Sequence, residues 1–402
     1  MNKRKRMALF IAFLAIVFCG SQDQQNQIDQ KIKSIETRLF DLTGQSRSNL
    51  SLLDEMASKN VPGVSIAVVD AGKIDWAKGY GVLKAGTSEP VTTETVFEPA
   101  STTKMFTSVI MLTLVEKGLI GLDEDVNKYL KSWKIPDNEF TKNQKVTLRH
   151  ILSHRAGFNR PEGGFSYDDG KLPTLANVLN GEAPAQNEGA VIEFAPGTKW
   201  QYSNMGYIVL QMLIEDITGK TYAQVALDTI IEPLKLKSST FNYPLSKKIE
   251  KILAETHDEK GNPRGHGLHP SAFAHGGLIT SPIDLAKFAI ELMNSYQGKS
   301  DILLSQKTAK LLFTKIIDLD PSEFGGIEVG MGLGVLLRGE GEDICFIMAG
   351  QNLPGTTSFL MGFPRHGKGA GIMTNGINGE LLQLELIGAI GREYDWPESK
   401  LF

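Results

Sequence analysis

The chain has 402 residues, with 42 Lys and Arg, 46 Asp and Glu, 2 Cys and a formal net charge of −4. Apolar residues make up 41% of it and charged residues 22%, which is ordinary globular usage and excludes a disordered or collagen-like chain. No basic patch suits a nucleic-acid partner, and two cysteines cannot build a disulfide framework or a cysteine-rich zinc site.

The first 19 residues have the pattern of an export leader. Basic residues at positions 3–6 precede the apolar run 7–18, which is short for a membrane span. Cys19 then begins a Gln-rich tether, as in a bacterial lipoprotein signal, although Phe18 stands where a small residue is usual. We therefore expect an exported cell-envelope protein, anchored to the membrane through a lipid on Cys19. Ordinary cleavage to a periplasmic form and an uncleaved anchor are the alternatives.

Two helices and then a hairpin are expected after the tether. A helix is predicted by five apolar positions spaced by three or four residues, Ile28, Ile32, Ile35, Leu39 and Leu42. Its seam covers about two heptads, so it either lies on the body of the domain or forms a dimerising stalk. A second helix is expected over 50–59. The β-rich runs 64–69 and 73–80 then predict a hairpin.

Helices dominate the middle of the chain, and strands return near its end, over 343–348, 356–363 and 369–373, before a final helix over 380–394. This order predicts an α+β fold, in which an antiparallel sheet from both chain ends is flanked by helices and a helical domain is inserted. The expected divisions are the leader, the tether with its helix, the sheet subdomain and the helical subdomain, over 1–19, 20–49, 50–100 with 300–402, and 101–299.

Ser101 and Lys104 form the first pair that could carry chemistry. They are three residues apart at the start of the apolar run 105–115, which predicts a buried helix with both side chains on one face. A serine hydroxyl is a weak nucleophile and needs a neighbouring base, and a desolvated lysine can lose its proton near neutrality. Taken alone, a helix cap with a solvated lysine explains the pair equally well.

A second segment lies about 100 residues later, where Tyr202 and Asn204 flank one serine. On a loop, both side chains could face one pocket, the phenol as a proton relay and the amide as a hydrogen-bond donor. A surface turn is the alternative, because Ser and Asn are common turn residues.

Several sequence blocks occur in the order typical of one family. They cover 61–69, 101–126, 152–158, 200–207, 232–234 and 276–286. On these blocks the chain resembles the β-lactamase-related serine hydrolases, the group of class C β-lactamases, D-alanyl-D-alanine carboxypeptidases and related esterases. The resemblance extends over about residues 50–395.

The resemblance implies a role for each matching position. Ser101 is then the nucleophile, Lys104 its partner and Tyr202 the group that exchanges protons with it, while Asn204 donates from its amide. The implied oxyanion hole uses the nucleophile's own N–H and one from the strand after the third motif. No metal or organic cofactor is implied, and the partner is a small-molecule or peptide substrate.

The third motif departs from the family pattern, which has Lys or His, one residue and then Gly. Matching on Gly350 puts Met348 in the cationic position and makes Gln351 the oxyanion N–H, whereas matching on Gly355 shifts the register. Neither register yields a cation, which the family uses to hold a substrate carboxylate and support the tyrosine's charge. We therefore expect uncharged esters or amides as substrates, unless a cation from another loop takes its place.

The histidines leave two alternatives open. His150 and His154, four residues apart, could pair on a metal or belong to a structural element. Four more histidines lie in one Gly-rich stretch: His257, His266, His269 and His275. This stretch could form a metal-binding loop or a loop that faces the substrate.

The expected function is therefore that of an exported serine hydrolase that forms an acyl-enzyme on Ser101 with an ester or amide. One alternative is a β-lactamase or D-Ala-D-Ala carboxypeptidase of the penicillin-binding type. Another is a binding or sensor protein with very slow turnover. The sequence does not specify the substrate or the oligomeric state.

Overall fold

The computed structural model describes residues 23–39, 51–160, 171–267, 272–353 and 355–397. The predicted leader, Cys19 and His269 therefore lie outside the described residues. The chain separates into two compact units, one formed by Met1–Met56 with Leu384–Phe402 and the other by Ala57–Gln383. The four-part division expected from the sequence stays a prediction.

In the smaller unit, residues 23–37 form a helix, as the apolar spacing predicts. Ile35 and Leu39 of this segment are buried, and the Lys31 ammonium lies 3.9 Å from the centroid of the Tyr394 ring near the chain's end. Part of its apolar seam, Ile35 and Leu39, is therefore covered, and whether the helix lies on the body of the domain or forms a dimerising stalk stays a prediction.

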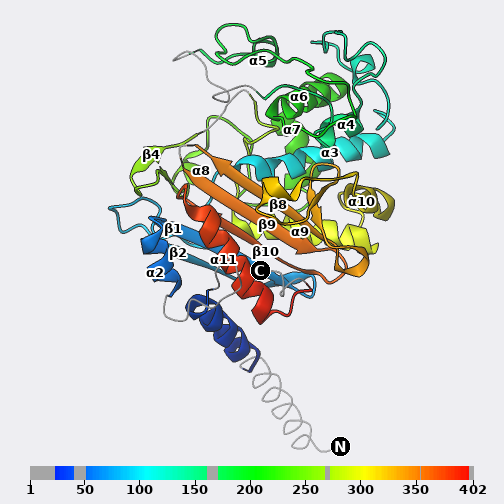
Figure 1. The fold of residues 1–402 in the computed structure, drawn as a ribbon. Coiled ribbons are helices and arrows are strands. Elements are labelled where there is room, and N and C mark those ends of the chain that lie inside the picture. The colour runs from blue at the N-terminus through cyan, green and yellow to red at the C-terminus, as the bar shows by residue number, and fades with distance from the viewer. Residues whose placement is uncertain (1–22, 40–50, 161–170, 268–271, 354, 398–402) are drawn as a thin grey trace, which may run out of the picture. The chain divides into compact units, whose positions relative to one another are not determined.

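One eight-stranded antiparallel sheet forms the frame of the larger unit, in the order β2-β1-β10-β9-β8-β7-β6-β5. Val64 pairs with Thr374, so a strand from the first part of the chain lies beside one from its end (Figure 1). The fold class predicted from the sequence is confirmed. The strands are β1 (Gly63–Asp70), β2 (Lys73–Gly81), β5 (Ile317–Asp318), β6 (Gly330–Met331), β7 (Leu336–Arg338), β8 (Cys345–Asn352), β9 (Thr356–Phe363) and β10 (Lys368–Thr374).

Helices cover the sheet and fill the middle of the chain. The helix α9 packs on β1, β9 and β10, with Ser281 as its N-cap and Pro282 at its first position. A separate pair of short strands is formed by β3 (Thr256–His257) and β4 (Pro263–Gly265). The helices are α2 (Leu52–Ser58), α3 (Thr103–Glu116), α4 (Leu148–Leu152), α5 (Leu175–Asn180), α6 (Asn204–Thr218), α7 (Tyr222–Ala226), α8 (Lys247–Glu250), α9 (Pro282–Gln297), α10 (Gln306–Leu312) and α11 (Gly379–Glu393).

The helix α3 lies at the centre of the main hydrophobic core. All but two of its residues are buried, because its sequence is apolar on every side, and it packs against α6 and α7. Figure 1 shows these helices, in cyan and green, gathered with α4 and α5 beside the sheet. The buried helix predicted over 105–115 is confirmed, and it begins earlier, directly after the 3₁₀ turn η1 (Ala100–Thr102).

Within the described ranges, no helix is both long enough and apolar enough to cross a membrane.

Candidate active site

Ser101 lies in the tight turn η1, immediately before α3. Ala100 has a φ of 47°, a left-handed conformation that is strained for a residue with a side chain. The strand β9 holds this turn in place, since Ser358 Oγ donates to Pro99 O at 2.6 Å and lies 2.8 Å from Thr102 Oγ1. The serine is therefore presented on a bent backbone that is anchored to the sheet on both sides.

Two side chains meet at Ser101 Oγ, one from three residues away and one from 101 residues away in the sequence. The Tyr202 hydroxyl lies 2.6 Å from it, and Lys104 Nζ donates to it at 3.0 Å. Lys104 Nζ also donates to the backbone oxygen of His275 at 2.7 Å, which aims the amine at the serine. The structure thus brings Ser101, Lys104 and Tyr202 into one hydrogen-bonded cluster, the arrangement that the sequence blocks imply.

The environment of Lys104 disfavours its charged form. The side chain is 1% exposed, and this burial lowers the pKa of Lys104, while the nearby Tyr202 opposes the shift. A buried amine with a lowered pKa can be neutral near neutral pH, in which state it accepts protons. The alternative of a solvated lysine on a helix cap is therefore wrong.

His154 supports the segment that carries Tyr202. Its ring centroid lies 4.6 Å from that of Tyr202, its Nδ1 accepts from the Ser203 N–H at 3.2 Å, and its backbone oxygen accepts from the Gln201 N–H at 2.8 Å. Burial, with a smaller contribution from Lys104, lowers the pKa of His154 to about 3, so the imidazole is neutral. Sequence reasoning missed this contact, because 48 residues separate His154 from Tyr202.

His150 and His154 do not face one ligand. His150 belongs to the N-cap of α4, where its Nδ1 accepts from the Thr147 N–H at 3.3 Å, while His154 packs on Tyr202. Of the two alternatives that the sequence leaves open for this pair, the structural element fits. Among the described residues, no group of three or more His, Cys, Asp or Glu could hold a metal ion.

Asn204 is the first residue of α6, directly after the Tyr202 segment. Its Oδ1 is buried and has no hydrogen-bond partner, an unusual state for a buried amide oxygen. Ser203 beside it is 4% exposed and donates from Oγ to the Asn159 backbone oxygen at 2.8 Å. The segment is therefore part of the buried site, and its interpretation as a surface turn is wrong.

The strand β8 forms the other side of the site. A Cβ added to Gly350 would lie 2.1 Å from Pro99 O and 2.9 Å from Ser101 N, so only a glycine lets the strand approach the serine this closely. Gly355 lies instead against the backbone of His257. Met348 is on the same face of the strand as Gly350, because side chains alternate, and is 7% exposed, whereas Gln351 is exposed.

Two of the remaining histidines, His257 and His266, are held by different partners. The ring of His257 is fixed by the Asn375 backbone oxygen at 2.7 Å and the Ala85 N–H at 3.0 Å. His266 Nδ1 lies 3.4 Å from the carboxylate of Glu98, which is 3% exposed. These two rings therefore do not share a metal.

Glu98 is a second residue that sequence reasoning missed. It accepts from the Gly267 N–H at 3.1 Å and from Asn352 Nδ2 at 2.7 Å. A single buried carboxylate thus ties the segment before Ser101 to the end of β8 and to the loop after β4. Its position three residues before the serine was the only signal in the sequence.

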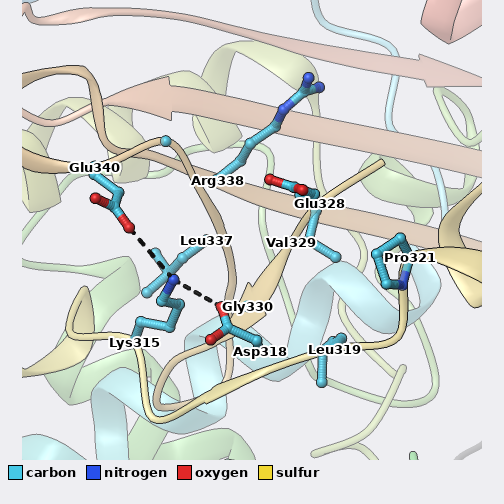
Figure 2. Close-up of a pocket in the computed structure, with 11 residues that line it drawn as sticks. Lys315, Asp318, Leu319, Pro321, Glu328, Val329, Gly330, Leu337, Arg338 and Glu340 are labelled. Carbon is cyan, nitrogen blue, oxygen red and sulfur yellow. Dashed lines mark ion pairs between the residues drawn. The ribbon is translucent and has the colours of Figure 1, made fainter. Parts of the chain in front are cut away.

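A cavity of about 450 Å³ at the β5–β7 edge is separate from this cluster. Figure 2 shows Lys315 in it, between Asp318 at 2.7 Å and Glu340 at 3.8 Å. Its lining contains neither Ser101 nor Lys104 nor Tyr202. The lysine charge there is already paired, so the cavity offers no comparable reactive group.

A family model described as Beta-lactamase matches residues 51–385. Among curated proteins, an N-acetylmuramyl-L-alanine amidase of Bacillus subtilis (strain 168) is 26% identical over 364 residues, which is 80% of each chain. An unguisins hydrolase of Aspergillus campestris is 31% identical over 244 residues, 58% of this chain and 44% of that protein. This chain thus spans less than half the length of some curated relatives, including the protein flp of Staphylococcus aureus, of which it covers 39%.

Solved structures agree with these sequence matches. An octameric penicillin-binding protein homologue from Pyrococcus abyssi superposes with a TM-score of 0.70 at 26% identity, over 85% of this chain and 75% of that one. A D-amino acid amidase from Ochrobactrum anthropi SV3 superposes with a TM-score of 0.68 at 23% identity, over 85% and 96%, a likeness that shows the fold alone.

Proposed function

The chain belongs to the beta-lactamase family, and we propose that it is a serine hydrolase whose nucleophile is Ser101, acting through an acyl-enzyme. The observation that carries this proposal is the contact of Ser101 Oγ with both Tyr202, at 2.6 Å, and Lys104, at 3.0 Å. A nucleophile with a base in hydrogen-bond reach, itself oriented by a third group, is the arrangement that nucleophilic catalysis requires.

In the first half of the reaction, Tyr202, as the phenolate beside Lys104, takes the proton of Ser101. Ser101 Oγ then bonds to the substrate carbonyl carbon, whose oxygen becomes an oxyanion. When that oxyanion collapses, the bond to the leaving group breaks, and Tyr202 returns its proton to the leaving group. The products of this half are the acyl-enzyme and a free alcohol or amine.

In the second half, Tyr202 takes a proton from water, and the resulting hydroxide attacks the acyl carbon. The ester bond to Ser101 breaks, the acid leaves and the proton returns to Ser101 Oγ. The buried Lys104 stays next to Tyr202 in both halves. Its charged form balances the phenolate, and its neutral form accompanies the neutral phenol. Deacylation therefore uses the same groups as acylation.

The oxyanion is proposed to bind the backbone N–H groups of Ser101 and Gln351. The close approach of Gly350 to Ser101 N supports the register in which Gln351 follows the third-motif glycine, and Gly355 is too far along the chain to serve, since it contacts His257. Asn204, whose Oδ1 has no partner, is proposed to bind the substrate through its side-chain amide.

Met348 carries the proposal for substrate class. It occupies the strand position where a cation would hold a substrate carboxylate, and it is almost fully buried in the hydrophobic core. A buried thioether offers no counter-charge, so neutral esters or amides are the proposed substrates rather than β-lactams or terminal D-Ala-D-Ala peptides. The amidase among the curated relatives supports the amide form of the proposal.

We also propose that the protein is exported and attached to the bacterial cell envelope through Cys19. The support is the basic and apolar pattern of residues 3–18, together with the relatives that include an amidase and a penicillin-binding protein 4* of Bacillus subtilis. Incorporation of labelled palmitate into the full chain, and its loss in Cys19→Ser, would support the anchor. Release of an unlabelled mature protein would refute it.

A serine-reactive fluorophosphonate probe tests the nucleophile. The wild-type protein is expected to take up one equivalent of the probe, and Ser101→Ala none. Ser305→Ala is the control, because Ser305 is the N-cap of α10 and bonds to Glu116 rather than to Lys104 or Tyr202. Labelling of Ser101→Ala at full stoichiometry would show that another residue is the nucleophile.

A panel of p-nitrophenyl esters, D-amino peptides and a chromogenic β-lactam then separates the candidate functions. Sustained turnover of neutral esters supports the proposal. Hydrolysis of the β-lactam or of D-Ala-D-Ala peptides, lost in Ser101→Ala, would indicate the penicillin-binding alternative. Release of one product equivalent followed by arrest would indicate the sensor.

A further inference from the structure

Two cationic side chains contact the ring of Tyr202. Lys104 Nζ lies 5.0 Å from the ring centroid, and the guanidinium carbon of Arg160 lies 5.7 Å from it. Both distances fall within the range of a cation–π interaction, which extends to about 6 Å. The surroundings of the two cations differ, because Lys104 is buried whereas Arg160 is exposed to solvent.

The backbone next to Arg160 is fixed to the segment that carries Tyr202. Asn159 is 5% exposed, and its backbone oxygen accepts from Ser203 Oγ at 2.8 Å. The same asparagine donates from its N–H to the Val191 oxygen at 2.9 Å and accepts the Val191 N–H on its Oδ1 at 3.1 Å. Arg160 therefore extends from an anchored position, tied to the residue that follows Tyr202.

Arg160 brings a positive charge to the ring of Tyr202. Arginine side chains carry a positive charge in proteins, and among the residues that the structure describes Arg160 forms no ion pair. Lys104 differs, since burial lowers its pKa and it can lose its charge. When Tyr202 becomes a phenolate, its ring gains negative charge, which strengthens the attraction to a cation on the ring.

We propose that Arg160 is a positioning residue that stabilises the phenolate form of Tyr202, the form that accepts the Ser101 proton. The proposal rests on the relay proposed above and adds a cation to it from a segment outside the three sequence motifs. Among the described residues, the titratable groups near the ring besides Lys104 of α3 are His154, which is neutral, and Tyr207 of α6, which His154 contacts in turn.

This assignment reconciles the intact relay with the apolar Met348. One function expected of a strand cation, support of the tyrosine's charge, is carried by Arg160 from another segment. The other, holding a substrate carboxylate next to β8, is left without a residue on that strand. The enzyme can therefore activate its serine while still disfavouring carboxylate substrates.

The test is the pH dependence of kcat/KM for Arg160→Gln and Arg160→Lys, each with a neutral p-nitrophenyl ester and with an ester that carries a carboxylate. Arg365→Gln is the matched control, because Arg365 also lies over a tyrosine ring, that of Tyr296 at 5.9 Å, away from Ser101. Thermal unfolding of each variant establishes that it is folded.

Loss of the cation makes the phenolate harder to form, so the acidic limb of the profile is expected to move to higher pH in Arg160→Gln. A shift of about one pH unit corresponds to about tenfold lower kcat/KM on that limb, equal for both esters. In Arg160→Lys the acidic limb is expected to lie close to its wild-type pH, and in Arg365→Gln at the wild-type pH.

Two results would overturn the proposal. If the acidic limb does not move and kcat/KM falls only for the carboxylate ester, Arg160 is a substrate-binding residue. If the limb does not move and kcat/KM falls for neither ester, Arg160 has no role in the reaction. In both cases the Ser101 proposal stands as long as Ser101→Ala abolishes probe labelling. Continued labelling of Ser101→Ala would instead contradict the Ser101 proposal, and the Arg160 proposal would fall with it.

Discussion

The two sides of the site are built differently. On the helix side, the buried Lys104 and the partly buried Ser101 and Tyr202 satisfy one another by hydrogen bonds. On the strand side, Gly350 allows a close approach to the serine, but Met348 contributes no charge and Gln351 faces solvent. The contrast indicates that the means of activating the nucleophile and the means of recognising a substrate can change independently.

The largest effect is expected on the helix side, from Lys104→Met. The change removes the buried amine at nearly constant volume, so that Tyr202 loses its nearest charge partner. General acid–base groups contribute about 100- to 10,000-fold, and we expect a loss of that size in kcat/KM for a neutral ester. A loss below tenfold in a folded variant would mean that Lys104 is structural only.

The next effect is expected where the two sides touch, from Gly350→Ala. The added Cβ would overlap Pro99 O at 2.1 Å and displace the strand from Ser101 N. Loss of one oxyanion donor lowers kcat about 100- to 1,000-fold. We therefore expect kcat of Gly350→Ala to fall by a similar factor, with little change in KM. Gly391→Ala, a glycine of α11 whose added Cβ meets only ordinary contacts, is the control. Equal activities of both variants would contradict the close approach.

A smaller effect is expected from restoring a cation on the strand side with Met348→Lys. A hydrogen bond to a charged group contributes about 1.5–3 kcal/mol, so kcat/KM for a carboxylate ester relative to its neutral analogue should rise about tenfold or more. Met348→Leu should leave that ratio unchanged. A ratio that does not move in the lysine variant would contradict the register that places Met348 beside the substrate.

The last effect concerns stability, through His154. Its pKa is about 3 in the folded protein against an ordinary value of 6.5, so between these pH values the unfolded chain binds the additional proton. The neutral imidazole therefore contributes stability that is present above the unfolded pKa and is lost as pH falls toward the folded one. The loss is about 1.4 kcal/mol per pH unit.

Urea unfolding of the wild type and of His154→Gln at several pH values measures this contribution. The free energy of unfolding of the variant should fall less steeply between pH 6.5 and about 3. Parallel curves for the two proteins would mean that His154 is charged in the folded state, and the stacked contact with Tyr202 would then need another explanation.

The sequence predicted the helix side of the site better than the strand side. Ser101, in the turn η1, and Lys104, at the start of α3, are three residues apart, so their spacing alone places them together, and the ordered blocks supplied Tyr202. The contacts of His154 and Arg160 with Tyr202 depend on how loops fold over the helices. No local spacing encodes such contacts, and they became visible only in the structure.

The strands of the sheet also differ in how well the sequence predicted them. The long strands β9 and β10 lie within one residue of their predicted bounds, because hydrophobic runs of this length are distinctive. The strands β5, β6 and β7 have only two or three residues, too few to display a period of two, and were not predicted. The strand expected over 343–348 runs instead over Cys345–Asn352, since pairing with β9 carries it past Gly350 toward the serine.

The acyl-enzyme on Ser101 is tested most directly by mass spectrometry of protein quenched in acid during steady-state hydrolysis of a neutral p-nitrophenyl ester. One acyl group per chain is expected, located by fragmentation on the peptide that contains Ser101 and absent from Ser101→Ala. An acyl group on another residue, or undiminished turnover by Ser101→Ala, would contradict it.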